Sequence, residues 1–183
     1  LGQQVDGLTV ATPLGIAATS GAAPEFSMDM VYGLIPGSIG ETSVIAIALG
    51  AILLLWTGIA SWKTMGSVFV GGALMAWIFN TIGLDTPMAQ MPWYEHLVLG
   101  GFCFGAVFMA TDPVTSARTE TGKYIFGFLI GVMAIIIRVL NPGYPEGMML
   151  AILLMNIFAP LIDYYVVESN ISRRAKRAIK SNN

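Results

Sequence analysis

Two threonines and an aspartate stand close together near the start of the chain, in the stretch VDGLTVATPLG at residues 5–15. Thr9 and Thr12 lie three and six residues after Asp6, among small residues such as Ala11. A threonine hydroxyl is a nucleophile once its proton is removed. A threonine directly before a proline is also a typical helix N-cap. The stretch therefore allows two interpretations, an attachment point for another group or a plain helix cap or turn.

Two carboxylates stand beside or within long apolar stretches, Asp112 in MATDPV and Asp163 in IFAPLIDYY. Asn156, Pro160 and Asp163 are spaced four and three apart, which places them on one face of a helix. Pro160 leaves the carbonyl of Asn156 without its helical donor, and hard cations prefer oxygen ligands. Asp112, Asn156 and Asp163 are therefore candidates for a Na⁺ path. A helix-ending turn or an interfacial, hydrated position is the plainer alternative for the two aspartates.

The composition is that of an all-α integral membrane protein. Of the 183 residues, 55% are hydrophobic and only 11% are charged, with a mean hydropathy of +0.72. Soluble domains carry about 25% charged residues. The single cysteine excludes an internal disulfide and a cysteine-ligated cluster built from this chain alone, and the single histidine argues against a histidine-based metal site.

Apolar runs predict five transmembrane helices, because a bilayer core of about 30 Å needs roughly 20 residues of helix. These runs are residues 43–60, 64–82, 96–111, 123–140 and 148–167. They divide the chain into an N-terminal segment (1–42), a membrane domain (43–167) and a C-terminal tail (168–183). Because the chain begins at Leu1 without a basic leader, we expect a piece of a longer protein.

The basic residues predict the orientation. Eight of the nine, including Lys63, Arg118 and Lys123, fall on the side of the C-terminal tail, which is assigned to the cytoplasm. The tail, SRRAKRAIK, is expected to contact anionic lipid rather than nucleic acid. The N-terminal segment and the NPGYPEG turn then lie outside. The ninth basic residue, Arg138, is expected to pair with Glu146 in that turn, with phosphate binding as the alternative.

Small residues recur at a spacing of four within the predicted spans, which favours close packing between helices. The pairs are Ser67–Gly71, Gly101–Gly105 and Gly127–Gly131.

Four stretches together resemble NqrB, the B subunit of the Na⁺-translocating NADH:quinone oxidoreductases (Nqr), in its C-terminal half. They are IPGSIGE (35–41), MPWYEHLVLGGFCFGAVFMATDPV (91–114), GVMAIIIRVLNPGYPEGMMLAILLMNIFAPLID (131–163) and VVESNISRR (166–174). The resemblance implies a ten-helix bundle of two inverted five-helix repeats in the bacterial inner membrane, of which this chain would be one half. It also implies membership of a six-subunit, Na⁺-pumping translocase.

The resemblance gives the N-terminal stretch a specific role. Members of this family, and the related RnfD protein of the Rnf complex, carry FMN joined through its phosphate to a threonine in a motif similar to D-x-x-[ST]-G-A-[ST]. Asp6, Thr9, Ala11 and Thr12 match this motif, and Val10 replaces its glycine. Thr12 is thereby implied to be the acceptor, modified by a flavin transferase outside the cytoplasm. The charge-based orientation places Thr12 on the same side.

By the same resemblance, electrons would reach this FMN from the FMN of NqrC, the C subunit of the complex, and pass on to riboflavin and ubiquinone. Asp112 and Asp163 match acidic positions that the family associates with sodium uptake. Two other functions stay open at the level of the sequence. One is that of RnfD, in a ferredoxin:NAD⁺ oxidoreductase, and the other is that of a flavin-free channel of the urea or ammonia type.

Overall fold

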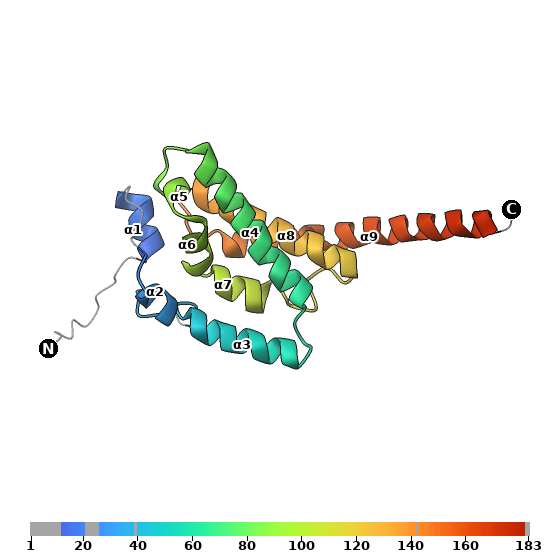
Figure 1. Cartoon of the computed structure of the whole chain (residues 1–183), viewed down its shortest axis with the longest axis horizontal. Coiled ribbons are helices and arrows are strands. Elements are labelled where there is room, and N and C mark those ends of the chain that lie inside the picture. Colours follow the sequence, from blue (N-terminus) through green and yellow to red (C-terminus); the bar gives the residue numbers. More distant parts are fainter. Residues whose placement is uncertain (1–11, 21–25, 39, 142, 182–183) are drawn as a thin grey trace.

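The computed structural model describes residues 12–20, 26–38, 40–141 and 143–181, and every regular element in these ranges is helical (Figure 1). The all-α prediction is confirmed for this part of the chain. In chain order the elements are α1 (Pro13–Ser20), α2 (Asp29–Tyr32), α3 (Val44–Trp56), α4 (Trp62–Ile82), α5 (Pro87–Gln90), α6 (Trp93–Val98), α7 (Phe102–Phe104), the π-helix η1 (Gly105–Met109), α8 (Glu120–Leu140) and α9 (Met148–Ser181).

Among the described residues, three helices are long and apolar enough to cross a membrane: α4, α8 and the part of α9 from Met148 to Arg177. At 1.5 Å per residue, the 21 residues of α4 and of α8 reach about 32 Å, which matches the apolar thickness of a bilayer. The predicted spans at 64–82, 123–140 and 148–167 are therefore confirmed as helices of spanning length.

Contacts between distant segments define two ends of this helix bundle. At the Glu120 end, Lys63 at the start of α4 forms an ion pair with Glu120 at the start of α8. At the Arg138 end, Arg138 near the end of α8 donates to the carbonyl of Pro145, just before α9 begins. Helices α4 and α8 therefore run parallel to each other, and α9 runs antiparallel to both. The chain between α4 and α8 must return from the Arg138 end to the Glu120 end.

That return path corrects the expectation of one continuous helix over 96–111. Helix α6 ends at Val98, Leu99 is extended (φ −80°, ψ 143°), and Gly100 has φ +66°, a left-handed conformation that costs glycine little. Helix α7 and the π-helix η1 follow the break. In the predicted Gly101–Gly105 motif the two glycines flank α7 and meet different neighbours, because a Cβ on Gly101 would contact Glu41 and a Cβ on Gly105 would contact Met148.

The first predicted span, 43–60, is shorter in the structure. Ser43 caps α3, its Oγ accepting a hydrogen bond from the N–H of Ala46 at 3.4 Å, and Gly58 (φ +72°) follows its end. The 13 residues of α3 reach about 20 Å, less than the apolar core of a bilayer. In Figure 1, α3 lies below α4 and α8, on the side of α7. Its length alone does not establish a membrane crossing.

Helices α4 and α8 pack through the predicted small-residue motifs. A Cβ on Gly131 would lie 2.5 Å from the backbone nitrogen of Gly72, and a Cβ on Gly127 would lie 2.5 Å from the carbonyl oxygen of Thr64. Gly71 on α4 likewise lies against the backbone of α8. Such close backbone approach is possible only without side chains. The packing role predicted for these glycines is confirmed.

The last helix does not end at the predicted domain boundary. Helix α9 continues through residues 167 and 168 to Ser181, a length of 34 residues. Residues 168–177 are all exposed, and Figure 1 shows this part of α9 extending well beyond the other helices. The basic tail is therefore a helical continuation of a membrane-spanning segment.

Candidate functional site

Thr12 lies directly before α1 and caps it. Its Oγ1 accepts a hydrogen bond from the backbone N–H of Gly15 at 3.1 Å, and its carbonyl accepts from the N–H of Ile16 at 2.9 Å. The N-cap geometry considered for this threonine is thus present. The cap uses a lone pair of the hydroxyl oxygen, so it does not consume the hydroxyl proton that a phosphoryl acceptor would lose. Asp6, Thr9 and Ala11 lie outside the described residues.

A small cavity of about 20 Å³ lies beside Thr12. Its walls come from segments far apart in the sequence, including Glu41, Thr42, Gly100 and Glu146. This volume holds about one water molecule. The Thr12 hydroxyl is half buried, and both a phosphoryl group and the ring system of an attached flavin would have to lie outside this cavity.

Arg138 organises the end of the bundle on which Thr12 lies. Its side chain is 1% exposed and donates to the carbonyls of His96 (2.6 Å), Leu99 (3.3 Å), Pro145 (3.2 Å) and Glu146 (3.3 Å). The expected ion pair with the Glu146 carboxylate is not formed within the described part of the chain. The guanidinium instead takes up carbonyls released by the break after α6, together with carbonyls of the turn before α9. Its burial also removes it from contact with an external phosphate.

The carboxylate of Glu146 has a different partner in the same region. It accepts the backbone N–H of Gly101 at 3.0 Å, and its Oε2 lies 2.5 Å from where a Cβ on Gly100 would be. A Cβ on Gly101 would lie 2.8 Å from Oε2 of Glu41. Two carboxylates thus flank the glycine pair beside Thr12, and the glycines permit this close approach. The two carboxylates also place negative charge near the Thr12 hydroxyl.

Asp163, a candidate for the Na⁺ path, anchors the start of α8 at the opposite end of the bundle. Its carboxylate accepts the backbone N–H of Arg118 (2.7 Å), the N–H of Thr119 (3.0 Å) and the hydroxyl of Thr119 (2.6 Å). Thr119 in turn caps α8, its Oγ1 accepting the N–H of Gly122 at 3.1 Å. Three donors hold this carboxylate in place, which is the capping role weighed for it from the sequence.

Asp112 forms a local turn. Its carboxylate accepts the hydroxyl of Thr115 at 2.8 Å and the backbone N–H groups of Val114 (3.3 Å) and Thr115 (3.2 Å). The helix-ending turn considered for Asp112 is therefore present in the structure.

The three candidate Na⁺ ligands do not converge on one ion. Asn156 and Asp163 lie seven residues apart on α9, or about 10 Å along its axis. Asp112 and Asp163 bind different donors, one within its own turn and one at the start of α8. Within the residues that the structure describes, no group of three or more His, Cys, Asp or Glu side chains could hold a metal ion.

Sequence reasoning missed two of these arrangements. Thr119 precedes an acidic first turn of α8, which is the pattern of an N-cap, so its role had a local signal. The four carbonyl partners of Arg138 had no local signal in the sequence. Two of these carbonyls lie 39 and 42 residues away and lose their helical donors only through the break after α6.

Helices of spanning length and polar networks gathered at the two ends of the bundle define the chain as part of a helical integral membrane protein. Residues 2–172 match the NQR2, RnfD, RnfE family. The chain belongs to this family.

Curated relatives agree closely with this chain over nearly its whole length. It is 58% identical over 177 residues to the B subunit of the Na(+)-translocating NADH-quinone reductase of Chromohalobacter salexigens, covering 94% of this chain and 43% of the relative. The proteins of the same name from Ectopseudomonas mendocina and Klebsiella pneumoniae are 54% and 52% identical, covering 96% and 94% of this chain and 45% and 44% of their own lengths. The chain thus spans less than half the length of these relatives.

Proposed function

We propose that this chain is part of the membrane-embedded B subunit of a Na⁺-translocating NADH:quinone reductase, an enzyme that couples electron transfer to Na⁺ transport. The observation that carries the proposal is the 52–58% identity, over nearly the whole chain, to proteins of that name. The family description also includes RnfD and RnfE. The relatives favour the Nqr assignment, and the electron donor of the purified complex, NADH or ferredoxin, tests it.

In this proposal Thr12 carries covalent FMN, with Asp6, Thr9 and Ala11 forming the sequence recognised by a flavin transferase. A hydroxyl at a helix N-terminus, half buried and beside glycines, supports the attachment chemistry. The flavin supplies one- and two-electron redox chemistry when it is bound. The chain's own residues position the attachment atom, while the contacts with riboflavin, ubiquinone and NqrC belong to the full-length protein in its complex.

The proposed topology has five crossings and places Thr12 outside the cytoplasm of the bacterial cell. Glu41 before α3 lies beside Gly101 at the Arg138 end, whereas Lys63 after α3 lies at the Glu120 end. The chain therefore passes between the two ends through α3, α4, the broken segment 99–119, α8 and α9. Basic residues at the Glu120 end favour a cytoplasmic position for that end. Five crossings correspond to one of the two inverted five-helix repeats expected for the full-length protein.

The Na⁺ path is a further part of the proposal. Asp112 and Asp163 offer carboxylate oxygens toward the Glu120 end, and Asn156 lies two turns deeper along α9. Because they are separated, they would act as successive contacts for a moving ion rather than as one closed site. Asp163 would have to exchange its N–H and hydroxyl donors for the ion.

The decisive test is the intact mass of the full-length protein produced with and without the flavin transferase. We expect an adduct of FMN less one water, mapped to Thr12, only when the transferase is present. Thr12→Ser should keep the adduct. Thr12→Asn should lose it while preserving the helix cap, because asparagine caps as well as threonine but has no hydroxyl. An unmodified wild-type protein beside an active transferase, or an adduct that persists in Thr12→Asn, would contradict the assignment.

A further inference from the structure

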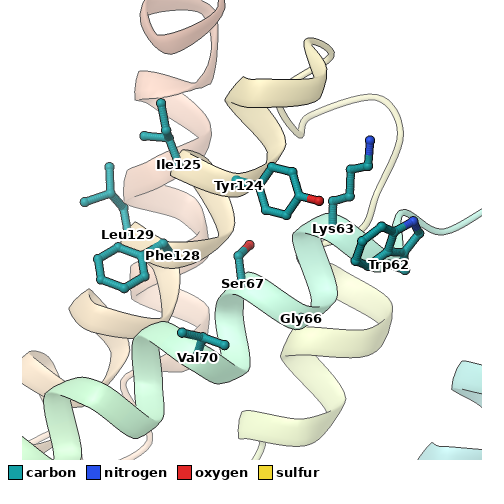
Figure 2. Close-up of a pocket in the computed structure, with 9 residues that line it drawn as sticks. All are labelled: Trp62, Lys63, Gly66, Ser67, Val70, Tyr124, Ile125, Phe128 and Leu129. Atoms are coloured by element: carbon teal, nitrogen blue, oxygen red, sulfur yellow. The ribbon is translucent and has the colours of Figure 1, made fainter.

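An open groove runs along the outer face of α4 and α8, where the two helices lie side by side (Figure 2). It has a volume of about 580 Å³, and its walls are almost wholly apolar, with Val70, Ile125 and Leu129 among them. Gly66 and Ser67 keep its α4 side low. Its shape and lining suit a flexible hydrocarbon chain lying along the helices.

Aromatic residues lie at the end of the groove where α4 and α8 begin. The rings of Trp62 and Tyr124 meet edge to face, with their centroids 6.2 Å apart and an interplanar angle of 85°. The Nζ atom of Lys63 lies 5.9 Å and 5.8 Å from the two ring centroids. Trp and Tyr concentrate at the depth of lipid headgroups. If α4 and α8 span the membrane, the groove therefore begins at the membrane interface and continues toward the middle of the bilayer. Figure 2 shows the residues that line it.

The same end carries an excess of positive charge. Lys63 and Lys123 both form ion pairs with one carboxylate, that of Glu120, so the cluster keeps a net charge of one positive unit. The two lysine side chains are 26% and 24% exposed. Helices α4 and α8 both begin here, and the dipoles at their N-termini add to the positive potential.

We propose that this groove binds one anionic phospholipid, with an acyl chain along Val70 and Leu129 and the headgroup phosphate at Lys63 and Lys123. A protein helix is a poorer occupant, because it would bury the cluster around Glu120 and take its charges out of water. A lipid headgroup leaves the charged side chains hydrated, and its phosphate neutralises the excess positive charge of the cluster. The proposal needs only that α4 and α8 span the membrane, and does not depend on the flavin.

The test uses the full-length protein in its complex, reconstituted into phosphatidylcholine vesicles. The vesicles contain equal fractions of either acyl-brominated phosphatidylglycerol or acyl-brominated phosphatidylcholine. Bromine quenches tryptophan fluorescence at contact. The difference between the wild-type protein and Trp62→Phe isolates the emission of Trp62.

We expect Trp62 to be quenched at least twofold more by the brominated anionic lipid. The double variant Lys63→Gln/Lys123→Gln should lose this preference. Arg173→Gln/Arg174→Gln, which removes the same charge from the exposed tail, should retain it. Equal quenching by both lipids would mean unselective lipid contact, and no quenching by either would mean that protein covers the groove. Each of these two outcomes would overturn the proposal.

Discussion

A single guanidinium, that of Arg138, bonds to four carbonyl oxygens from two segments that are distant in sequence. It thereby joins the break after α6 to the turn before α9. A buried charge with this many donors is stable only when each donor finds an acceptor, and a carbonyl left without a donor costs about 1–3 kcal/mol. The geometry around Thr12, Gly100 and Glu146 therefore depends on one side chain that touches neither Thr12 nor the cavity beside it.

Arg138→Lys should destabilise the protein although it preserves the charge, because one ammonium group cannot reach all four carbonyls. We expect a loss on the order of 2–3 kcal/mol, seen as a fall of several degrees in the thermal midpoint of the detergent-solubilised full-length protein. Arg177→Lys, in the exposed part of α9, is the matched control and should leave the midpoint unchanged. Equal midpoints for the two variants would show that the four-carbonyl arrangement is dispensable.

Asp163 has an observed anchoring role and a proposed ionic one, and a pair of variants separates them. Thr119→Val removes the hydroxyl that bonds to Asp163 and caps α8, with little change in shape. It should lower the thermal midpoint without changing the Na⁺ concentration that gives half-maximal turnover of the complex. Asp163→Asn should lower the midpoint and also raise that Na⁺ concentration. If Asp163→Asn leaves half-saturation unchanged, Asp163 only anchors α8.

At the scale of elements, the sequence predicted those features that depend on local pattern. Long apolar runs predicted α4, α8 and α9, and the spacing of Gly127 and Gly131 predicted the face on which α8 packs. The break at Leu99 and Gly100 was not predictable from hydropathy, because its residues are as apolar or small as those of a continuous span. Its cause is the conformation of Gly100 together with the bond from Arg138 to Leu99, which is a tertiary contact.

The crossing of α4 and α8 gives the sharpest prediction at this scale. Gly131→Ala would place a methyl group against the backbone of Gly72, so the two helices must separate, with a cost of about 1–3 kcal/mol. Gly66→Ala is the matched control, because nothing lies within 4 Å of its added methyl group, and alanine favours helix. In chemical denaturation in mild detergent, the free energy of unfolding should be lower for Gly131→Ala than for the wild type, and equal to or higher than the wild type for Gly66→Ala. The reverse order would contradict packing through Gly131.

For the molecule as a whole, the proposed topology places the Arg138 end of the bundle outside the cytoplasm and the Glu120 end inside it, and labelling from one side of the membrane tests this. The test uses a full-length protein in which all native cysteines, Cys103 among them, have been replaced. In that protein we expect the cysteine of Tyr144→Cys to react with a membrane-impermeant maleimide applied from outside the inner membrane. Arg177→Cys should react only after that membrane is opened. Mass measurement of the labelled protein reads both results. Labelling of Arg177→Cys from outside would invert the proposed orientation and place Thr12 in the cytoplasm.

The unbroken course of α9 has a mechanical consequence. Pro160 lies inside this helix, where a proline removes a backbone hydrogen bond and allows a bend. The 18 residues beyond Asp163 form a rod about 27 Å long. Swinging such a rod by about 10° at the proline carries its tip about 5 Å, while atoms near the pivot barely move. A small change of angle at Pro160 would therefore displace the basic tail far more than the atoms within the membrane.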